Sequence, residues 1–194
     1  MMKQNKLDIF NFTINSIEAG WLKARIMVED TSLDFTVSYL SEPLSSFLEV
    51  LLELDAHYDR RYYLADGLKP EFHLVWQGEP WQYTWLFEPQ QDRKVAITIF
   101  YCEDHLGSKN TEEHIKIKTV VTLDNLMREV SKEAESILKT YGFLGYKTEW
   151  IQSDFPIGDL LRLHSVLNGD EPQEKSLSKE VGYFNKLLRS QEAV

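Results

Sequence analysis

The chain has 194 residues, of which 43% are hydrophobic and 12% aromatic. This apolar content is enough to build a core and excludes an intrinsically disordered protein. Its 31 acidic and 21 basic residues give a net charge of −10, which repels phosphate backbones and anionic lipids and argues against nucleic acid or a membrane as partner. Cys102 is the only cysteine, no stretch is apolar enough to span a bilayer and the first residues carry no signal-peptide segment, which predicts a cytoplasmic protein without disulfides.

The first forty residues alternate between apolar and polar side chains, as strands with one buried face do. The period then changes to that of an amphipathic helix, which we expect to run to about His57. Ser41 is its predicted N-cap and Pro43 lies in its first turn, because a Ser hydroxyl accepts from an unpaired amide and Pro has no amide to leave unpaired. The three strands are predicted at 8–14, 21–28 and 33–40.

Alternation with period two returns after residue 70 and predicts four more strands. Consecutive strands, with one helix after the third and others after the seventh, indicate an α+β fold rather than alternating parallel βαβ units. We therefore expect a largely antiparallel sheet of six or seven strands, with helices packed on one face and a further C-terminal helix. The later strands are predicted at 72–76, 79–88, 95–102 and 114–121.

Two more helices are predicted beyond the strands. The longer one, at 123–141, has Thr122 as its N-cap and ends at Gly142, because glycine readily adopts the left-handed conformation that closes a helix. The shorter one lies within 154–169. We interpret residues 1–170 as a single α+β domain and 171–194 as a charged linker followed by a C-terminal amphipathic helix.

The stretch EPWQYTWLFE, residues 79–88, carries an aromatic side chain at every second position. On a half-buried strand, such a row is first of all core, packed under a helix. Trp and Tyr also have a polar tip that needs a partner, so three of them in one row suggest a partly open face rimmed by acids, as in a protein-binding hot spot. The binding residues predicted on this basis are Trp76, Trp81, Tyr83, Trp85, Glu79 and Glu88.

The segment CEDHLGSKNTEEH places His and carboxylate side chains on both sides of one predicted hairpin loop. Zinc and iron accept such ligands, but the same residues also keep a solvated turn soluble, and the sequence contains no HExxH motif. We therefore predict no metal and no cofactor. The residues that a metal would use here are Asp104, His105, Glu112 and His114.

No catalytic set is predicted either. Cys102 is close to His105 in sequence, which would activate a thiol, but alternation places it on one strand face with Phe100, as expected of a packed residue. Glu79 and Glu88 flank the aromatic strand, and a carboxylate pair with an aromatic platform is typical of glycoside hydrolases. Their spacing does not favour that chemistry.

Two motifs resemble a widespread family of small, acidic, uncharacterised bacterial proteins. In that family, a strand ends in a turn like SYLSDPL that leads into a helix, and a strand like EPGEYRW precedes one of VRIRI type. The resemblance covers about residues 30–165, and it implies no established activity or catalytic residues. The matching positions are Ser38, Tyr39, Leu40, Pro43, Leu44, Glu79, Pro80, Tyr83, Trp85 and Phe87.

The leading hypothesis from the sequence is a non-enzymatic cytoplasmic protein that binds another protein. The negative charge suits a basic partner, because complementary charge speeds encounter, and an immunity-like protein paired with a toxin is one version. The alternative is a small-molecule-binding or hydrolytic enzyme with a pocket between sheet and helix. A third hypothesis is homo-oligomerisation through an edge strand or the C-terminal helix.

Overall fold

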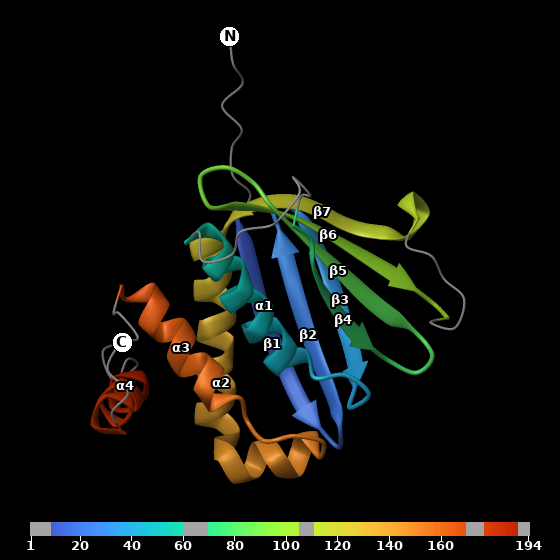
Figure 1. Cartoon of the computed structure of the whole chain (residues 1–194). Coiled ribbons are helices and arrows are strands. Elements are labelled where there is room, and N and C mark those ends of the chain that lie inside the picture. Colours follow the sequence, from blue (N-terminus) through green and yellow to red (C-terminus); the bar gives the residue numbers. More distant parts are fainter. Residues whose placement is uncertain (1–8, 60–69, 105–110, 170–176, 190–194) are drawn as a thin grey trace.

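The computed structural model describes residues 9–59, 70–104, 111–169 and 177–189, which form an α+β fold with two antiparallel sheets (Figure 1). The α+β class is confirmed, but the strands form two sheets of three and four strands instead of one sheet of six or seven. Sheet A has the order β1-β2-β3 and sheet B the order β4-β5-β6-β7. The strands are β1 (Phe10–Glu18), β2 (Trp21–Val28), β3 (Thr31–Ser38), β4 (Phe72–Gln77), β5 (Gln82–Pro89), β6 (Lys94–Cys102) and β7 (Ile115–Thr122).

Four α-helices complete the described part of the fold, and α1 connects the two sheets. Figure 1 shows α1 crossing β1 and β2, with α2 and α3 beside it and α4 at the outside. None of these helices is long and apolar enough to cross a membrane. The helices are α1 (Pro43–Tyr58), α2 (Leu123–Trp150), α3 (Ile157–Leu167) and α4 (Leu177–Arg189), and a short 3₁₀ helix, η2 (Glu112–His114), precedes β7.

The helix caps predicted from the sequence are confirmed only in part. The hydroxyl of Thr122 accepts from the amide of Asn125 at 3.2 Å, which confirms the predicted cap of α2. Glu42, not Ser41, is the N-cap of α1, because the Ser41 hydroxyl accepts from the amide of Gln77 in β4 at 3.0 Å.

Gly142 was predicted to end the helix; it has the expected left-handed φ of 63°, with ψ −174°, but the helix resumes after it and runs to Trp150. The turns at 143–150 were not predicted from the sequence. They carry Phe143, whose ring stacks on Phe184 of α4 with 6.0 Å between centroids. The C-terminal helix therefore contacts its own chain, while the predicted linker falls at 170–176, outside the described residues.

The two sheets and α1 share one aromatic core. Phe47 of α1 lies 5.5 Å from Phe12 of β1 and 5.2 Å from Trp85 of β5, measured between ring centroids. Phe35 of β3 lies 5.1 Å from Trp76 and stacks on Trp85 at 5.3 Å. Residues from four strands and one helix thus meet in one cluster, so neither sheet has a complete core without the other.

The outer edge of β1 is covered by side chains of α2. The amide of Ile14 donates to a carboxylate oxygen of Glu133 at 2.9 Å, and the amide of Ile17 donates to the hydroxyl of Tyr141 at 3.1 Å. An uncovered strand edge invites pairing with another chain, and these two bonds occupy amides that such pairing would use. An edge-strand oligomer through β1 is disfavoured for the same reason.

We expect Glu133→Ala to lower the free energy of unfolding by about 1.5–3 kcal/mol, because a buried amide loses a charged acceptor. Chemical denaturation of the two proteins measures the difference. Glu129→Ala is the matched control, since the half-buried Glu129 pairs with the exposed Lys132 on the same helix at 3.0 Å, and an ion pair with a solvated partner contributes less than about 1 kcal/mol. Equal losses in the two variants would contradict the role given to Glu133.

Candidate functional site

The aromatic row of β5 is mostly core. Trp76 is 1% exposed, Tyr83 is 7% exposed and Trp85 is fully buried, so these predicted binding residues cannot touch a partner in this conformation. Phe87 is also fully buried. Trp81, at the start of the row, is the member that remains partly exposed.

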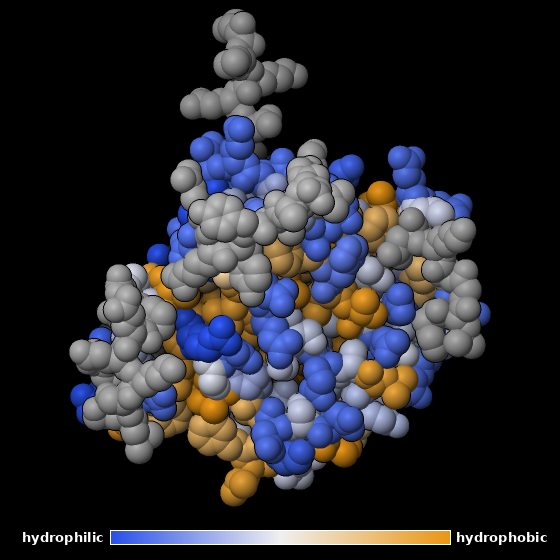
Figure 2. All heavy atoms as spheres, in the orientation of Figure 1, coloured by the Kyte–Doolittle hydropathy of each residue, from blue (hydrophilic) through white to orange (hydrophobic). Residues whose placement is uncertain are grey.

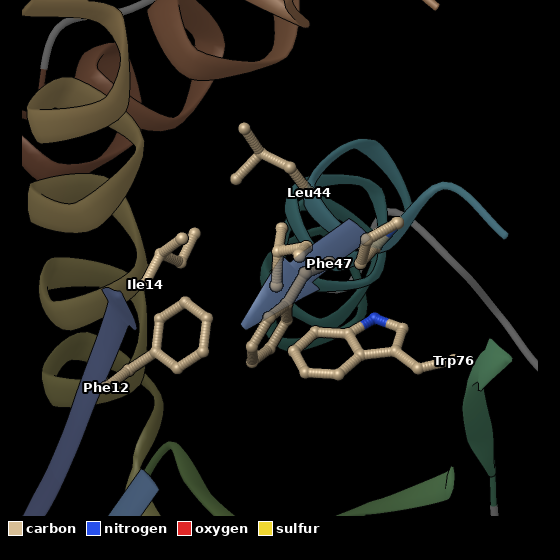
Figure 3. A pocket seen from close by; sticks show the side chains of 7 residues that line it. Phe12, Ile14, Leu44, Phe47 and Trp76 are labelled. Atoms are coloured by element: carbon tan, nitrogen blue, oxygen red, sulfur yellow. The ribbon is translucent and has the colours of Figure 1, made fainter. Parts of the chain in front are cut away.

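The space between α1 and the sheets is filled by these side chains. Figure 3 shows Phe12, Phe47 and Trp76 pointing toward one another in this space. It has no room for a water molecule, although the indole N–H groups of Trp76 and Trp85 are buried there without a hydrogen-bond partner. The small-molecule pocket predicted between sheet and helix is therefore closed at this position.

Trp81 crosses the edge of β3 to reach sheet A. Its indole N–H donates to the carbonyl of Thr36 at 2.8 Å, and its ring lies 6.3 Å from that of Trp21. The ring also covers Gly78, where a β-carbon would come within 2.1 Å of the indole nitrogen. Gly78 is thus required by this turn, in which the Glu79–Pro80 peptide bond is cis.

Exposed apolar side chains gather at the β1–β2 turn, next to the pair of Trp21 and Trp81. A β-carbon on Gly20 would lie 3.0 Å from Tyr39 and 3.4 Å from Ile151, so these two side chains meet over the β1–β2 turn. Figure 1 shows this turn, the end of β3 and the end of α2 at the lower end of the molecule, and Figure 2 shows hydrophobic residues reaching the surface there. We call Trp21, Tyr39, Leu40, Trp81 and Ile151 the turn-end patch.

Ile151 is the most exposed member of the turn-end patch, at 55%, and its backbone is unusual. It has φ 74° and ψ −50°, and the amide of Gln152 donates to the carbonyl of Trp150 at 2.9 Å. This is a γ-turn with positive φ, a rare and strained conformation that is especially unfavourable for a β-branched residue. No sequence signal marks Ile151, because neither Gly nor Asn stands there.

Acidic residues surround the turn-end patch. Glu18 pairs with Trp21 across the β1–β2 hairpin, and exposed Glu79 lies two residues before Trp81. Glu149 accepts from the amides of the same hairpin turn, at 2.7 Å through its backbone oxygen and 3.4 Å through its carboxylate. The patch is thus an apolar centre with a mainly acidic rim, in which Lys147, whose ammonium donates to the carbonyl of Gln152 at 3.3 Å, is a basic member.

Glu88 is separated from this rim by the whole of β5. The six residue steps from Gln82 to Glu88 span about 20 Å, whereas the two carboxylates of a glycoside hydrolase lie within about 10 Å. Glu79 and Glu88 therefore do not form such a pair. Of the two predicted acids, only Glu79 adjoins the turn-end patch.

The hairpin loop does not form a metal site among the described residues, where no group of three His, Cys, Asp or Glu side chains could hold an ion. His105 lies outside the described residues. The ring of His114 is 2.7 Å from the hydroxyl of Thr111, and this contact closes η2. Glu112 lies in the first turn of η2. Asp104 follows β6, in which Cys102 is buried.

A shallow hollow of about 270 Å³ lies on the outward face of sheet A. It is lined in part by Lys23, Arg25 and Asp34. The guanidinium of Arg25 bonds Asp34 at 2.6 Å, which lowers the pKa of that carboxyl and raises the pKa of Arg25. Because Arg25 and Asp34 already form an ion pair in solvent, they contribute little binding energy to a ligand in this hollow.

No protein-family model, curated protein or solved structure matches the chain. The resemblance drawn from the SYLSEPL and EPWQYTW motifs therefore stays a prediction. In the structure both motifs border the turn-end patch, with Tyr39 and Leu40 from the first and Trp81 from the second.

Burial raises the pKa of Tyr83, whose hydroxyl donates to the carbonyl of Asp34 at 3.3 Å. A Tyr ionises near pH 10 when unfolded, so its stabilising effect is complete below that pH and is lost as pH rises toward the folded pKa. We expect the free energy of unfolding to fall above about pH 10, and to fall less steeply in Tyr83→Phe. Urea unfolding at several pH values measures both slopes, and equal slopes would contradict this effect.

We expect Ile151→Gly to have a larger free energy of unfolding than Ile151→Ala, by about 0.5–1 kcal/mol. Only glycine adopts the positive φ without a steric cost of about 1–2 kcal/mol, and the greater entropy of glycine in the unfolded chain offsets part of that gain. Both variants remove the exposed side chain, so its contacts do not enter the comparison. Thermal and chemical denaturation give the values. An alanine variant as stable as the glycine variant would show that the turn is not strained.

Proposed function

We propose that the protein is a non-enzymatic protein-binding module whose contact surface is the turn-end patch. The observation that carries the proposal is Ile151, an exposed β-branched residue held in a strained γ-turn. Strained backbone concentrates at functional sites, because a conformation of this cost persists only where the surrounding structure imposes it. Here the strain presents an apolar side chain to solvent beside Tyr39.

The composition of the turn-end patch supports the same function. Trp and Tyr are enriched in binding hot spots, since each provides a large rigid surface with a polar tip. Trp81 is already oriented by its bond to Thr36 and by contact with Trp21, so a partner would pay little ordering entropy at this residue. Leu40 is 49% exposed and Tyr39 43%, which leaves an apolar centre for a partner to cover.

The acidic rim indicates the chemistry of the partner. Glu18, Glu79 and Glu149 surround the apolar centre, and the whole chain carries a net charge of −10. A basic protein with an apolar anchor residue fits such a surface, because charge complementarity steers encounter while the apolar centre holds the complex. A basic toxin or nuclease, with this protein as its immunity-like inhibitor, is one version of that partner.

We expect Leu40→Ser and Ile151→Ser each to weaken binding to the partner by about tenfold or more, which is the effect of truncating a hot-spot side chain. A partner isolated on the wild-type protein is purified, and its affinity for each variant is measured by calorimetry at low and high salt. Affinity should fall with salt, since the acidic rim attracts the partner.

Val181→Ser is the matched control, because Val181 is 47% exposed on α4, away from the turn-end patch. It should bind as the wild type does. Circular dichroism checks that all variants are folded. A purified partner that binds both patch variants with wild-type affinity would place its binding site elsewhere. Repeated catalytic turnover of a small molecule by the protein would contradict the non-enzymatic assignment.

A further inference from the structure

The strained γ-turn at Ile151 is bound on both sides by one carboxylate oxygen. Oε2 of Glu42 accepts from the indole N–H of Trp150 at 3.0 Å and from the hydroxyl of Ser153 at 2.5 Å. Trp150 directly precedes Ile151, and Ser153 follows two residues after it. Glu42 lies 108 residues before Trp150, at the N-terminus of α1, so the two bonds connect the γ-turn to a distant element.

The backbone of Glu42 is itself held in place. Glu42 is the N-cap of α1, and its carbonyl accepts from the amide of Ser46 at 2.9 Å. Pro43 follows in the first turn and restricts the backbone of the residue before it. On the other side, the hydroxyl of Ser41 accepts from the amide of Gln77 in β4 at 3.0 Å. The carboxylate of Glu42 therefore extends from a point that α1 and sheet B fix.

The loop that contains the γ-turn connects two buried aromatic residues. Trp150 is fully buried, and Phe155 is 4% exposed. Residues 151–154 join them, and a relaxed loop would avoid the positive φ of Ile151, which is unfavourable for a β-branched side chain. The bonds to Glu42 remove this freedom, because they hold Ser153 close to the indole of Trp150.

Lys147 also contacts this loop, but its contacts are weaker. Its ammonium donates to the carbonyl of Gln152 at 3.3 Å and lies 3.7 Å from the carboxylate of Asp154, whose side chain is 89% exposed. Exposed ion pairs contribute little stability. Hydrogen bonds to a carboxylate are about twice as strong as those between neutral groups, and the two bonds of Glu42 are shorter and less exposed. Glu42 is therefore the stronger constraint on the γ-turn.

We propose that Glu42 is the positioning residue of the turn-end patch, whose carboxylate imposes the γ-turn and thereby presents Ile151 to a partner. The inference rests on the proposed function of this patch. Glu42 acts through Ile151, because its bonds are made to residues on either side of it. Without these bonds the loop relaxes, and the side chain of Ile151 leaves its position beside Tyr39 above Gly20.

The effect of Glu42 on the turn is measured by repeating the comparison of Ile151→Gly with Ile151→Ala in a Glu42→Ala background. With Glu42 present, the glycine variant should have the smaller unfolding equilibrium constant, by about two- to fivefold. In the Glu42→Ala background this advantage should be lost, because a relaxed loop does not require positive φ and glycine has the greater entropy in the unfolded chain. Urea unfolding of the four full-length proteins measures the constants.

Glu49→Ala is the matched control, because Glu49 is an exposed Glu of α1 that contacts Ser45 of the same helix. The glycine advantage should remain in that background. Ser153→Ala removes one of the two donors to Glu42 and should reduce the advantage. A glycine advantage of full size in Glu42→Ala, or in Ser153→Ala where that variant alone folds, would overturn the inference.

Affinity for a partner separates positioning from a general structural role. For a partner isolated on the wild-type protein, Glu42→Ala should weaken binding by about tenfold or more, as Ile151→Ser does, although Ile151 is intact. The double variant Glu42→Ala with Ile151→Ser should bind no more weakly than Ile151→Ser, since both changes remove the same contact. Wild-type affinity in folded Glu42→Ala would overturn the inference. If Leu40→Ser and Ile151→Ser both bind normally, the proposed function fails, and the four unfolding constants still decide whether Glu42 imposes the turn.

Discussion

The free edge of β3 is the constraint on which the rest of the structure depends. Its carbonyl groups at Asp34 and Thr36 need donors, and Tyr83 and Trp81 supply them from the start of β5. Because side chains rather than a neighbouring strand satisfy this edge, the hydrogen-bonded ladder stops and seven strands form two sheets. The same two bonds hold the aromatic side chains of sheet B against Phe35, and so create the shared core.

This arrangement explains why most of one aromatic row is buried while its first member reaches the surface. Trp85 and Phe87 lie over the middle of the core, where α1 covers them through Phe47. Trp81 lies at the edge of sheet A, where its indole bonds the carbonyl of Thr36, and its ring extends across that edge to Trp21. The seam between the sheets therefore ends in an open aromatic surface.

The second half of α2 links stability to the proposed binding surface. Glu133 and Tyr141 hold the helix along the edge of β1, and the turns after Gly142 continue along it to Glu149, which bonds the β1–β2 turn. With the helix held at both ends, the chain must reverse sharply at Ile151, and the strained γ-turn is the result. A rigid base of this kind keeps the apolar side chain exposed when no partner is bound.

The sequence by itself determined the elements of this protein, and tertiary structure decided their grouping. All seven strands, α1, α3 and the left-handed conformation at Gly142 follow from local periodicity and from capping residues, which act within a few positions of the chain. The split into two sheets was not visible, because it depends on Trp81 and Tyr83 reaching carbonyl groups more than forty residues away. Burial of Trp85 was the first expectation from the alternation of its strand, but exposure of Leu40 and Ile151 could not be read from residue type, since both are apolar. Which apolar side chains remain outside is set by how far α1 and α2 extend over the sheets, and that is a property of packing between distant segments.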